Sequence, residues 1–539
     1  MSEVNVQQLA LAVQSGDAAK VRMLLHARPE LIGMNMSGGN EHRALHYAVL
    51  NRDASMVRLL MEAGADAHKG IWPHRDATSA LTIAQERQYR EIVAVIEEEE
   101  RKRREEMSCP NATVLPVQDQ INAAIAEGDN AAAIRLLEAD GTLIQACDSG
   151  GGTPLHTAAE YGNVAMAEWL LKRRAKVNKE DVAGLTALDR AALAVDDSFA
   201  QVAKLLIAHG ANVTIRAAVA LPDAARIREL LQANPSLLRQ VWRDGGLLTL
   251  AVNHGHLEIV RLLLDLGADV DERVMLEELE EPTLSWGSPL WHAAQQNEVE
   301  IARLLLDRGA DPNANVYASG WPLRNAWNHE GGELKRLLLE RGAKMQPYMV
   351  SETHNVAEAK RLLEEDASED LAQELTWSAC DHGCPEIVEM AIGRLPWPRR
   401  DSRWHWIIIQ PIRGAKSEGH FQCMAVLLRH GVDANVARYG QRALHFAAAY
   451  SGAVSDADRA RFAAMLLDAG AKLDVRDDLL KSTPLGWACR WGRTKVAELL
   501  IARGAVIDEP DAEDWATPKK WAEKMQHPDI VEMLAASRP

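Results

Sequence analysis

The stretch from Thr153 to Asn178, TPLHTAAEYGNVAMAEWLLKRRAKVN, constrains the fold more than any other part of the chain. Thr153 is a good helix N-cap, and Pro154 suits the first helical position, where its missing N–H costs nothing. Gly162 can take the left-handed conformation that ends such a helix. The next residues carry a buried stripe for a second, antiparallel helix, formed by Ala165, Ala167, Leu170 and Leu171. Both faces of this helix–turn–helix unit need neighbours, so it cannot fold alone.

Copies of this pattern follow one another along nearly the whole chain at a spacing of about 33 residues. Close copies begin at Arg43, Ser288 and Thr483. The pattern resembles the ankyrin repeat, with about sixteen repeats, roughly half of which carry strong TPLHxAA-like and GADxN-like signatures. The resemblance implies an all-α fold, an ankyrin-repeat solenoid of stacked helix pairs that are joined by short β-hairpin loops and curved into a superhelix.

The array of repeats is interrupted in one place. The third repeat keeps its helices but loses its hairpin, and its second helix runs into a charged tail from Glu97 to Glu106. Acidic and basic residues four apart in this tail indicate a solvated helix end, and a binding tail is the alternative. No repeat occupies the residues that follow. We therefore expect a short N-terminal array at 1–106, a linker at 107–116 and a long C-terminal array at 117–539.

The composition excludes several classes of protein. The formal net charge of −17 opposes binding to nucleic acids and to anionic membranes. Six scattered cysteines form no disulfide framework and suit a reducing compartment. The sequence contains no evident signal peptide and no apolar run of about 18 residues. We therefore expect a cytoplasmic monomer without a membrane span or a nucleic-acid partner.

Histidine follows the leucine of the repeat motif in three repeats, at His46, His156 and His445. The resemblance implies that these side chains tie neighbouring loops together, which is a structural role. Other repeats replace this histidine by Trp291, Arg324, Trp377 and Arg413.

The loop at 272–287 is longer than the equivalent loop after Asn178 by about nine residues. Hairpin tips of such stacks project beside the groove, so this loop could form an acidic contact finger that ends at Trp286. The alternative is a tolerated surface insertion with Trp286 tucked under it. Its acidic residues are Glu277, Glu278, Glu280 and Glu281.

A second unusual loop, GRLPWPRRDSRWHWIII at 393–409, mixes aromatic and basic residues. Such side chains can stack on bases or hold an acidic peptide. They can equally fill a gap between imperfect repeats, with the tryptophans buried and the arginines in water, and we favour this structural interpretation. The residues concerned are Trp397, Arg399, Arg400, Arg403, Trp404, His405 and Trp406.

Polar and histidine side chains recur at inner-helix positions that face the concave groove of an ankyrin-like stack. Tryptophan, which is enriched among residues that dominate binding energy, is dense in the same region. We expect these residues to form the binding surface, with the two tryptophans as rim anchors: His254, His292, Gln296, Asn325, His329, His382, Trp286 and Trp491. Because unperturbed histidines titrate near pH 6.5, a contact through them should change affinity between about pH 5.5 and 7.5.

Catalytic and metal-binding signatures are missing from the sequence. It contains no HExxH, GxSxG, Walker A or dinucleotide-binding motif. Histidines at equivalent positions of successive repeats would be about 10 Å apart, too far to share a zinc ion. Cys380 and Cys384 are four residues apart on a helix, but Cys380 occupies a core alanine position. We therefore expect no metal and no cofactor.

The function expected from these observations is that of a non-catalytic scaffold that binds a protein partner in its concave groove. Repeat stacks present extended surfaces of this kind. The alternative is an enzyme, or a protein that binds a small molecule or metal, with its pocket in the groove around residues 254–382.

Overall fold

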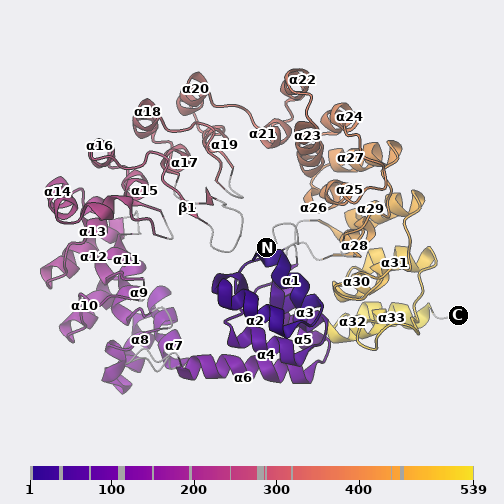
Figure 1. Ribbon diagram of the computed structural model, residues 1–539, viewed down its shortest axis with the longest axis horizontal. Coiled ribbons are helices and arrows are strands. Elements are labelled where there is room, and N and C mark those ends of the chain that lie inside the picture. The colour runs from indigo at the N-terminus through magenta and orange to yellow at the C-terminus, as the bar shows by residue number, and fades with distance from the viewer. Residues whose placement is uncertain are drawn as a thin grey trace. The chain divides into compact units, whose positions relative to one another are not determined.

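The computed structural model describes residues 4–35, 41–71, 74–106, 116–148, 151–181, 183–192, 197–242, 245–275, 284–285, 288–316, 320–438, 440–449 and 454–537. Within these residues the helices follow one another in sixteen helix–turn–helix pairs, one of which has a divided first helix (Figure 1). Each inner helix packs against the inner helix of a neighbouring pair, as α9 does with α11 and α17 with α19. The predicted all-α solenoid is therefore confirmed.

The chain groups into two compact units, which are described separately. Unit 1 comprises Met1–Ala44, Arg58–Ala65 and Ala94–Lys344, and unit 2 comprises Leu45–Val57, Asp66–Val93 and Met345–Pro539. Most of the predicted linker lies outside the described residues, although Pro116 begins α7. The predicted arrays at 1–106 and 117–539 therefore stay a prediction.

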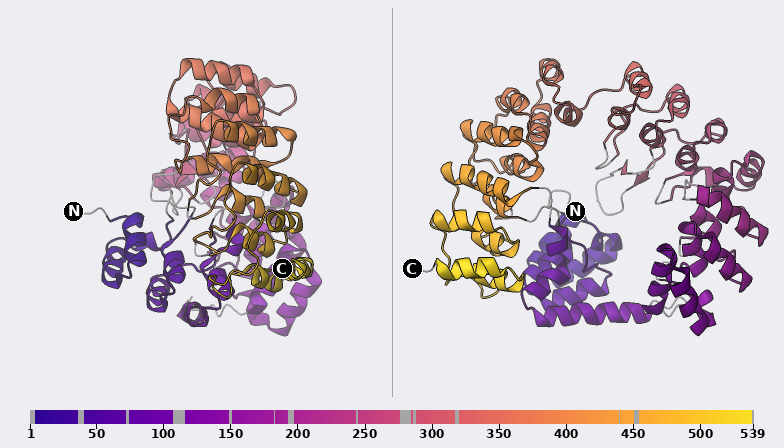
Figure 2. Two further views of the ribbon diagram at one scale, coloured as in Figure 1. Left: turned by 90° about the vertical axis from the view of Figure 1, so that its right-hand side faces the viewer. Right: turned by 180° about the vertical axis from the view of Figure 1, so that it is seen from behind.

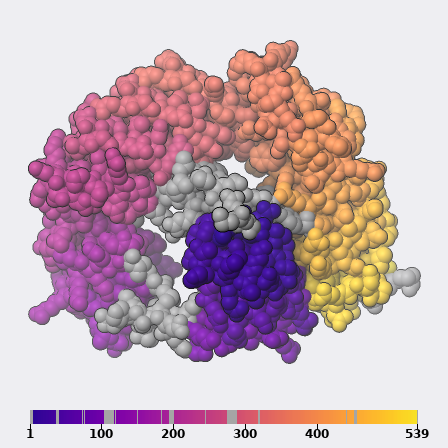
Figure 3. All heavy atoms as spheres, in the orientation of Figure 1, coloured from indigo at the N-terminus to yellow at the C-terminus, as the bar shows by residue number. Residues whose placement is uncertain are grey.

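Unit 1 contains most of the first half of the chain, and in Figure 3 the colour changes gradually along its stacked pairs. Its helices are α1 (Val6–Gln14), α2 (Ala18–Ala27), η1 (Pro29–Ile32), α7 (Pro116–Ala126), α8 (Asn130–Ala139), η3 (Gly141–Ile144), α9 (Pro154–Glu160), α10 (Val164–Lys172), α11 (Ala187–Ala191), α12 (Asp197–Ala208), α13 (Ile215–Ala220), α14 (Ala224–Ala233), η4 (Pro235–Arg239), α15 (Leu247–Asn253), α16 (Leu257–Asp265), α17 (Pro289–Gln295), α18 (Val299–Asp307), α19 (Pro322–Ala326) and α20 (Glu333–Glu340). Strands β1 (Val274–Met275) and β2 (Leu284–Ser285) form an antiparallel hairpin, with Val274 opposite Ser285.

Unit 2 contains the C-terminal helix pairs together with part of the second and third pairs. Figure 2 shows the stacked C-terminal pairs from two further sides. The helices of unit 2 are η2 (Arg75–Ala77), α5 (Ala80–Glu86), α21 (Pro347–Glu352), α22 (Val356–Glu365), α23 (Glu369–His382), α24 (Pro385–Ile392), α25 (Trp404–Ile408), α26 (Gln410–Gly414), α27 (Glu418–Arg429), α28 (Ala443–Ala448), α29 (Asp456–Asp468), α30 (Pro484–Arg490), α31 (Thr494–Ala502), α32 (Pro518–Lys524) and α33 (Pro528–Ala536). Three helices have residues in both units: α3 (Ala44–Leu50), α4 (Ala54–Glu62) and α6 (Arg90–Glu106).

The motif at Thr153 shows how the sequence builds each pair. Thr153 caps α9, and its backbone N–H donates to Nδ1 of His156 at 3.1 Å. The other ring nitrogen of His156 lies 3.1 Å from the carbonyl oxygen of Leu185 in the next repeat. His46 and His445 contact the carbonyl oxygens of Lys69 and Val475 in the same way. The structural role predicted for these three histidines is confirmed.

Gly309 ends α18 in the left-handed conformation, with φ of +92°, and no atom lies within 4 Å of the place that a Cβ would occupy. A substitution there would therefore meet backbone strain rather than a clash. We expect Gly309→Val to lower the free energy of unfolding by about 1 kcal/mol or more, measured by urea denaturation. Gly141→Val is the control, because Gly141 has equally open space without a positive φ. Equal midpoints for the two variants would contradict the strain argument.

Candidate binding surface

Three neighbouring inner helices of unit 1, α15, α17 and α19, together with the turns that follow them, carry most of the predicted groove residues. We call their exposed and half-buried polar side chains the inner-helix surface. Its members are Asn253, His254, His292, Gln295, Gln296, Asn325, Asn328 and His329. Five of the eight residues predicted from the sequence lie on it: His254, His292, Gln296, Asn325 and His329.

Two of these histidines bind backbone carbonyl groups of other helix pairs: His329 binds that of the neighbouring pair, and His254 binds one at the end of α11, two pairs away. Nε2 of His329 lies 2.8 Å from the oxygen of Ala294, in α17, and Nε2 of His254 lies 2.9 Å from that of Ala192. His256 makes the same contact with Ala220 at 2.9 Å, and its ring stacks on that of His254 with 5.5 Å between centroids. The last carbonyls of a helix lack the i+4 donor of the helix interior, and each imidazole adds a hydrogen bond there; the Ala294 carbonyl also accepts from the Gln296 and Asn297 N–H groups. The histidines thus hold successive pairs in register.

Two hydrogen bonds between other members link α15, α17 and α19. Asn325 donates to the carbonyl of Trp291 at 3.2 Å, and Gln296 donates to the side-chain oxygen of Asn253 at 3.1 Å. His292 packs edge-on against Trp291 at 5.0 Å, and burial lowers its pKa to about 4. Burial also lowers the pKa of His254. His292 therefore stays neutral between pH 5.5 and 7.5, so it cannot supply the affinity change expected in that range.

The other three predicted residues lie elsewhere. His382 belongs to unit 2, where its Nδ1 lies 2.9 Å from the oxygen of Ser378 and its ring meets Tyr348 edge-on at 4.6 Å. Trp491, also in unit 2, is half-buried beneath His74, whose ring centroid is 5.2 Å away. Trp286 lies outside the described residues, as do Glu277, Glu278, Glu280 and Glu281.

The aromatic–basic loop at 393–409 is packed as the structural interpretation predicts. Trp397 and Trp404 are buried and meet edge-on at 5.2 Å. The Arg403 guanidinium lies over Trp397 at 4.4 Å, and that of Arg399 over Trp404 at 4.9 Å. Trp397 and Trp404 are therefore inside the fold, while Trp406 is half-buried with the Arg438 guanidinium over its ring at 5.4 Å.

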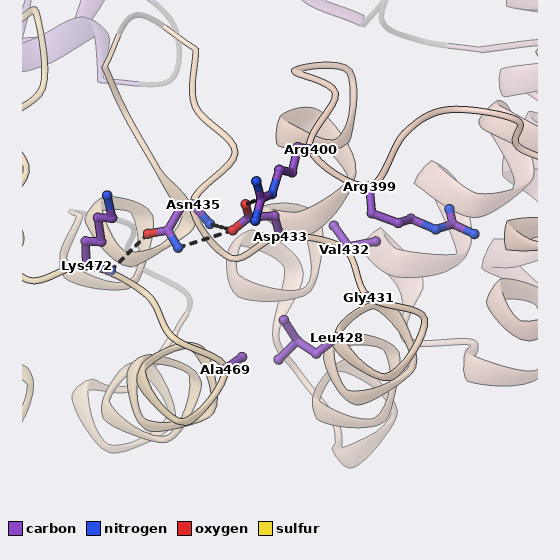
Figure 4. A pocket seen from close by; sticks show the side chains of 9 residues that line it. All are labelled: Arg399, Arg400, Leu428, Gly431, Val432, Asp433, Asn435, Ala469 and Lys472. Atoms are coloured by element: carbon purple, nitrogen blue, oxygen red, sulfur yellow. Dashed lines mark hydrogen bonds and ion pairs between the residues drawn. The ribbon is translucent and has the colours of Figure 1, made fainter.

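One side of this loop lines a pocket of about 650 Å³, shown in Figure 4. Arg400 points toward Asp433, with 3.3 Å between the paired atoms, while the Arg399 side chain points away from them. Asn435 bridges Asp433 and the backbone N–H of Lys472. Arg400 and Asp433 are thus paired with each other, and Leu428 and Ala469 contribute the apolar part of the lining.

A metal-ligand cluster or a reactive cysteine would be a further candidate site in the described part of the chain. No group of three or more His, Cys, Asp or Glu side chains there could hold a metal ion. Cys384 donates from its Sγ to the Ser351 carbonyl at 3.1 Å, and burial raises its pKa to about 12. Burial likewise raises the pKa of Cys380. Both thiols are core side chains.

A set of contacts in unit 2 was not predicted from the sequence. Side chains of residues 74–88 contact the inner helices α28 and α30, and the Glu86 backbone contacts α32. Repeat periodicity gives no signal for such a contact, because it joins residues about 400 positions apart. The only hint in the sequence is the density of tryptophan near residues 487–521.

Stacked helix–turn–helix pairs tied by histidine and glycine motifs define a helical repeat protein. Family models identify the repeat: ankyrin repeats (3 copies) match residues 121–217 and 216–316, and ankyrin repeat matches residues 40–69 and 481–514. The chain is an ankyrin repeat protein, and such repeats are generally protein–protein interaction modules.

Two solved structures illustrate the similarity. The chain is 26% identical to the human ASB11 ankyrin repeat domain over 42% of its own length and 98% of that chain, with a TM-score of 0.25. It is 24% identical to a chain in the complex of the predatory endopeptidase Bd0816 from Bdellovibrio bacteriovorus with the immunity protein Bd3460, over 35% of its own length and 96% of that chain, with a TM-score of 0.23. Comparison with curated protein sequences found no match. No helix in the described residues is long and apolar enough to cross a membrane.

Proposed function

We propose that the chain is a non-catalytic scaffold whose inner-helix surface in unit 1 binds a protein partner. The observation that carries this proposal is a row of exposed amide side chains on adjacent repeats, Gln295, Gln296 and Asn328. Amide side chains both donate and accept hydrogen bonds, which suits the backbone and polar side chains of another polypeptide. Ankyrin stacks use such continuous surfaces for recognition.

In this proposal the histidines of the surface position the amide side chains and do not themselves bind the partner. His329 is hydrogen-bonded to the Ala294 carbonyl, so it holds the turn after α19 against α17, and His254 holds the end of α15 against the Ala192 carbonyl at the end of α11. A row of side chains at fixed spacing loses little conformational entropy on binding. The net charge of −17 favours a partner whose contact face is basic.

We also place the protein in the cytoplasm as a monomer. In the part of the chain that the structure describes, five cysteines are free and buried, namely Cys147, Cys380, Cys384, Cys423 and Cys489. Free thiols persist in a reducing compartment. Light scattering of the purified chain tests the monomer, and imaging of a tagged chain tests the compartment.

A triple variant tests the binding surface. We expect Gln295→Ala/Gln296→Ala/Asn328→Ala to weaken partner binding at least tenfold, because it removes the exposed amides while the core contacts stay. The partner is captured from source cells with the immobilised chain and identified by mass spectrometry, and its purified form is then titrated calorimetrically. Gln232→Ala, an exposed amide on the outer helix α14, is the control. Equal affinities for the triple variant and the control would refute the surface.

The variant His329→Ala tests whether His329 stabilises the fold or contacts the partner. We expect it to lower the free energy of unfolding by about 1 kcal/mol, because the hydrogen bond that joins the turn after α19 to the Ala294 carbonyl of α17 is lost. The exposed neighbour Asn328 is the matched position, and Asn328→Ala should leave the urea midpoint unchanged. If His329→Ala unfolds at the wild-type urea concentration, the imidazole does not hold these pairs together.

A further inference from the structure

In unit 2 residues 74–88, which include α5, contact the inner face of the last three pairs. We call residues 74–88 the docked segment. The receiving face consists of Phe446 on α28, Trp487 and Arg490 on α30, the adjacent Trp491, Trp515 before α32, and Trp521 and Lys524 on α32. His74 is 4% exposed and lies 5.3 Å from Trp487, 5.2 Å from Trp491 and 6.1 Å from Phe446, measured between ring centroids.

The strongest contact in this interface is an ion pair between Glu86 and Arg490. Their side chains are 12% and 7% exposed, so both charges are largely removed from water. The Arg490 guanidinium also lies over Trp491 at 4.6 Å and over Trp521 at 5.1 Å. Removing one partner of such a pair leaves an uncompensated buried charge. The Glu86 carboxylate therefore compensates the charge of the buried Arg490 side chain.

Two further contacts surround the ion pair. Lys524 donates from its Nζ to the backbone oxygen of Glu86 at 2.6 Å, and the Arg87 guanidinium lies over Trp515 at 4.7 Å. On the other side of the segment, the Thr78 hydroxyl donates to the His74 carbonyl at 2.7 Å and accepts from the Ile71 N–H at 2.8 Å. This turn places His74 next to Trp487 and Trp491. Helix α5 ends at Glu86 and so places it next to Arg490 and Lys524.

These contacts are charged and aromatic rather than aliphatic. Interfaces of this polar kind within one chain open more readily than an apolar core does. Tryptophan, the dominant residue type of the receiving face, is among those that most often dominate binding energy at protein interfaces, as is arginine, present as Arg490. The face has the composition of a recognition surface, and its occupant is a segment of the same chain.

We propose that the docked segment is a reversible latch that closes this recognition surface. While the Glu86–Arg490 pair is intact, the segment covers the tryptophans of the receiving face. When the pair is broken, the segment leaves and the tryptophans become accessible, while the C-terminal pairs stay folded on their own helix–helix contacts, as between α30 and α31 and between α32 and α33. This surface lies in unit 2 and is separate from the inner-helix surface of unit 1.

Hydrogen exchange of the full chain, resolved by peptide mass spectrometry, tests the latch. We expect Glu86→Gln, which keeps the side-chain volume, to accelerate exchange of the α5 amides at least tenfold while α31 and α33 keep their wild-type rates. Arg490→Met should do the same, and the double variant should exchange no faster than the faster single variant, because both remove one interaction. Hydroxyl-radical footprinting should show increased oxidation of Trp491 and Trp515 in the same variants.

The control is Glu418→Gln, which breaks an ion pair of neighbouring repeats with Arg461 and does not touch the docked segment. It should leave α5 protected. Wild-type α5 exchange in Glu86→Gln would overturn the latch, and so would equal acceleration in α5, α31 and α33, since the segment would then belong to the core. Protection of α5 that rises with protein concentration, together with a doubled mass in light scattering, would assign the occupant to a second copy and overturn the intramolecular contact.

Discussion

Trp487→Ala is expected to lower the free energy of unfolding of unit 2 by about 3–5 kcal/mol, the usual cost of removing a large core aromatic side chain. Trp487 is fully buried, and its indole N–H donates to Oδ1 of Asp477 at 2.9 Å. Its ring also meets those of His445 at 5.4 Å and Trp491 at 5.0 Å. The substitution opens a cavity and removes a donor from a buried carboxylate, two penalties that add.

Urea denaturation followed by circular dichroism measures this loss of stability. The variant Trp487→Phe separates the cost of the cavity from the cost of the lost hydrogen bond. Phenylalanine keeps most of the ring but cannot donate to Asp477, so its cost should be intermediate. A loss below about 1 kcal/mol for Trp487→Ala would show that the site collapses around the missing ring, and that α30 is not anchored as described.

Acid is expected to destabilise unit 2 strongly between pH 7 and pH 5, because three of its histidines are buried in the neutral form. Burial is the largest cause that lowers the pKa of His74 and His445 to about 3 and that of His405 to about 4. A histidine in the unfolded chain has a pKa near 6.5. Below that pH the unfolded chain therefore binds protons at these histidines, whereas the folded chain keeps them neutral. The stability these groups contribute is present above pH 6.5 and is lost as the pH falls toward their folded pKa values.

Each of these histidines should cost about 2 kcal/mol at pH 5, or roughly 6 kcal/mol together. Burial raises the pKa values of Asp477 and Glu374, which act in the opposite sense and offset part of the loss. Urea midpoints at pH 7 and pH 5 measure the net effect. His445→Gln can still donate to the Val475 carbonyl but does not titrate, so its midpoint should fall less between the two pH values. A pH dependence identical to wild type would contradict a neutral buried His445.

Local motifs made most of the fold predictable. Each repeat carries its own cap, turn glycine and buried stripe, so the sequence around Thr153 is sufficient to predict α9 and α10. The roles of His46, His156 and His445 were predictable for the same reason, since each contact joins one repeat to the next loop. Interactions that span a single repeat leave a periodic trace in the sequence.

The candidate surfaces were harder to predict, because the hydrogen-bond and packing partners of each side chain determine whether it is available for binding. The periodicity places His254 and His329 on the inner helices, but it does not show that neighbouring carbonyls hold their rings. Nor could it show that burial moves the pKa of His292 away from physiological pH. Trp491 looked like a rim anchor, yet His74 covers it through a contact that no repeat pattern encodes.

Hydrogen exchange of the full chain with and without its captured partner tests partner binding by the inner-helix surface most directly. We predict that the partner slows exchange in α15, α17 and α19 and at the turns that follow them, while the outer helices α16, α18 and α20 keep their free rates. Protection confined to those outer helices, or to the loop at 393–409, with α15, α17 and α19 unchanged, would contradict it.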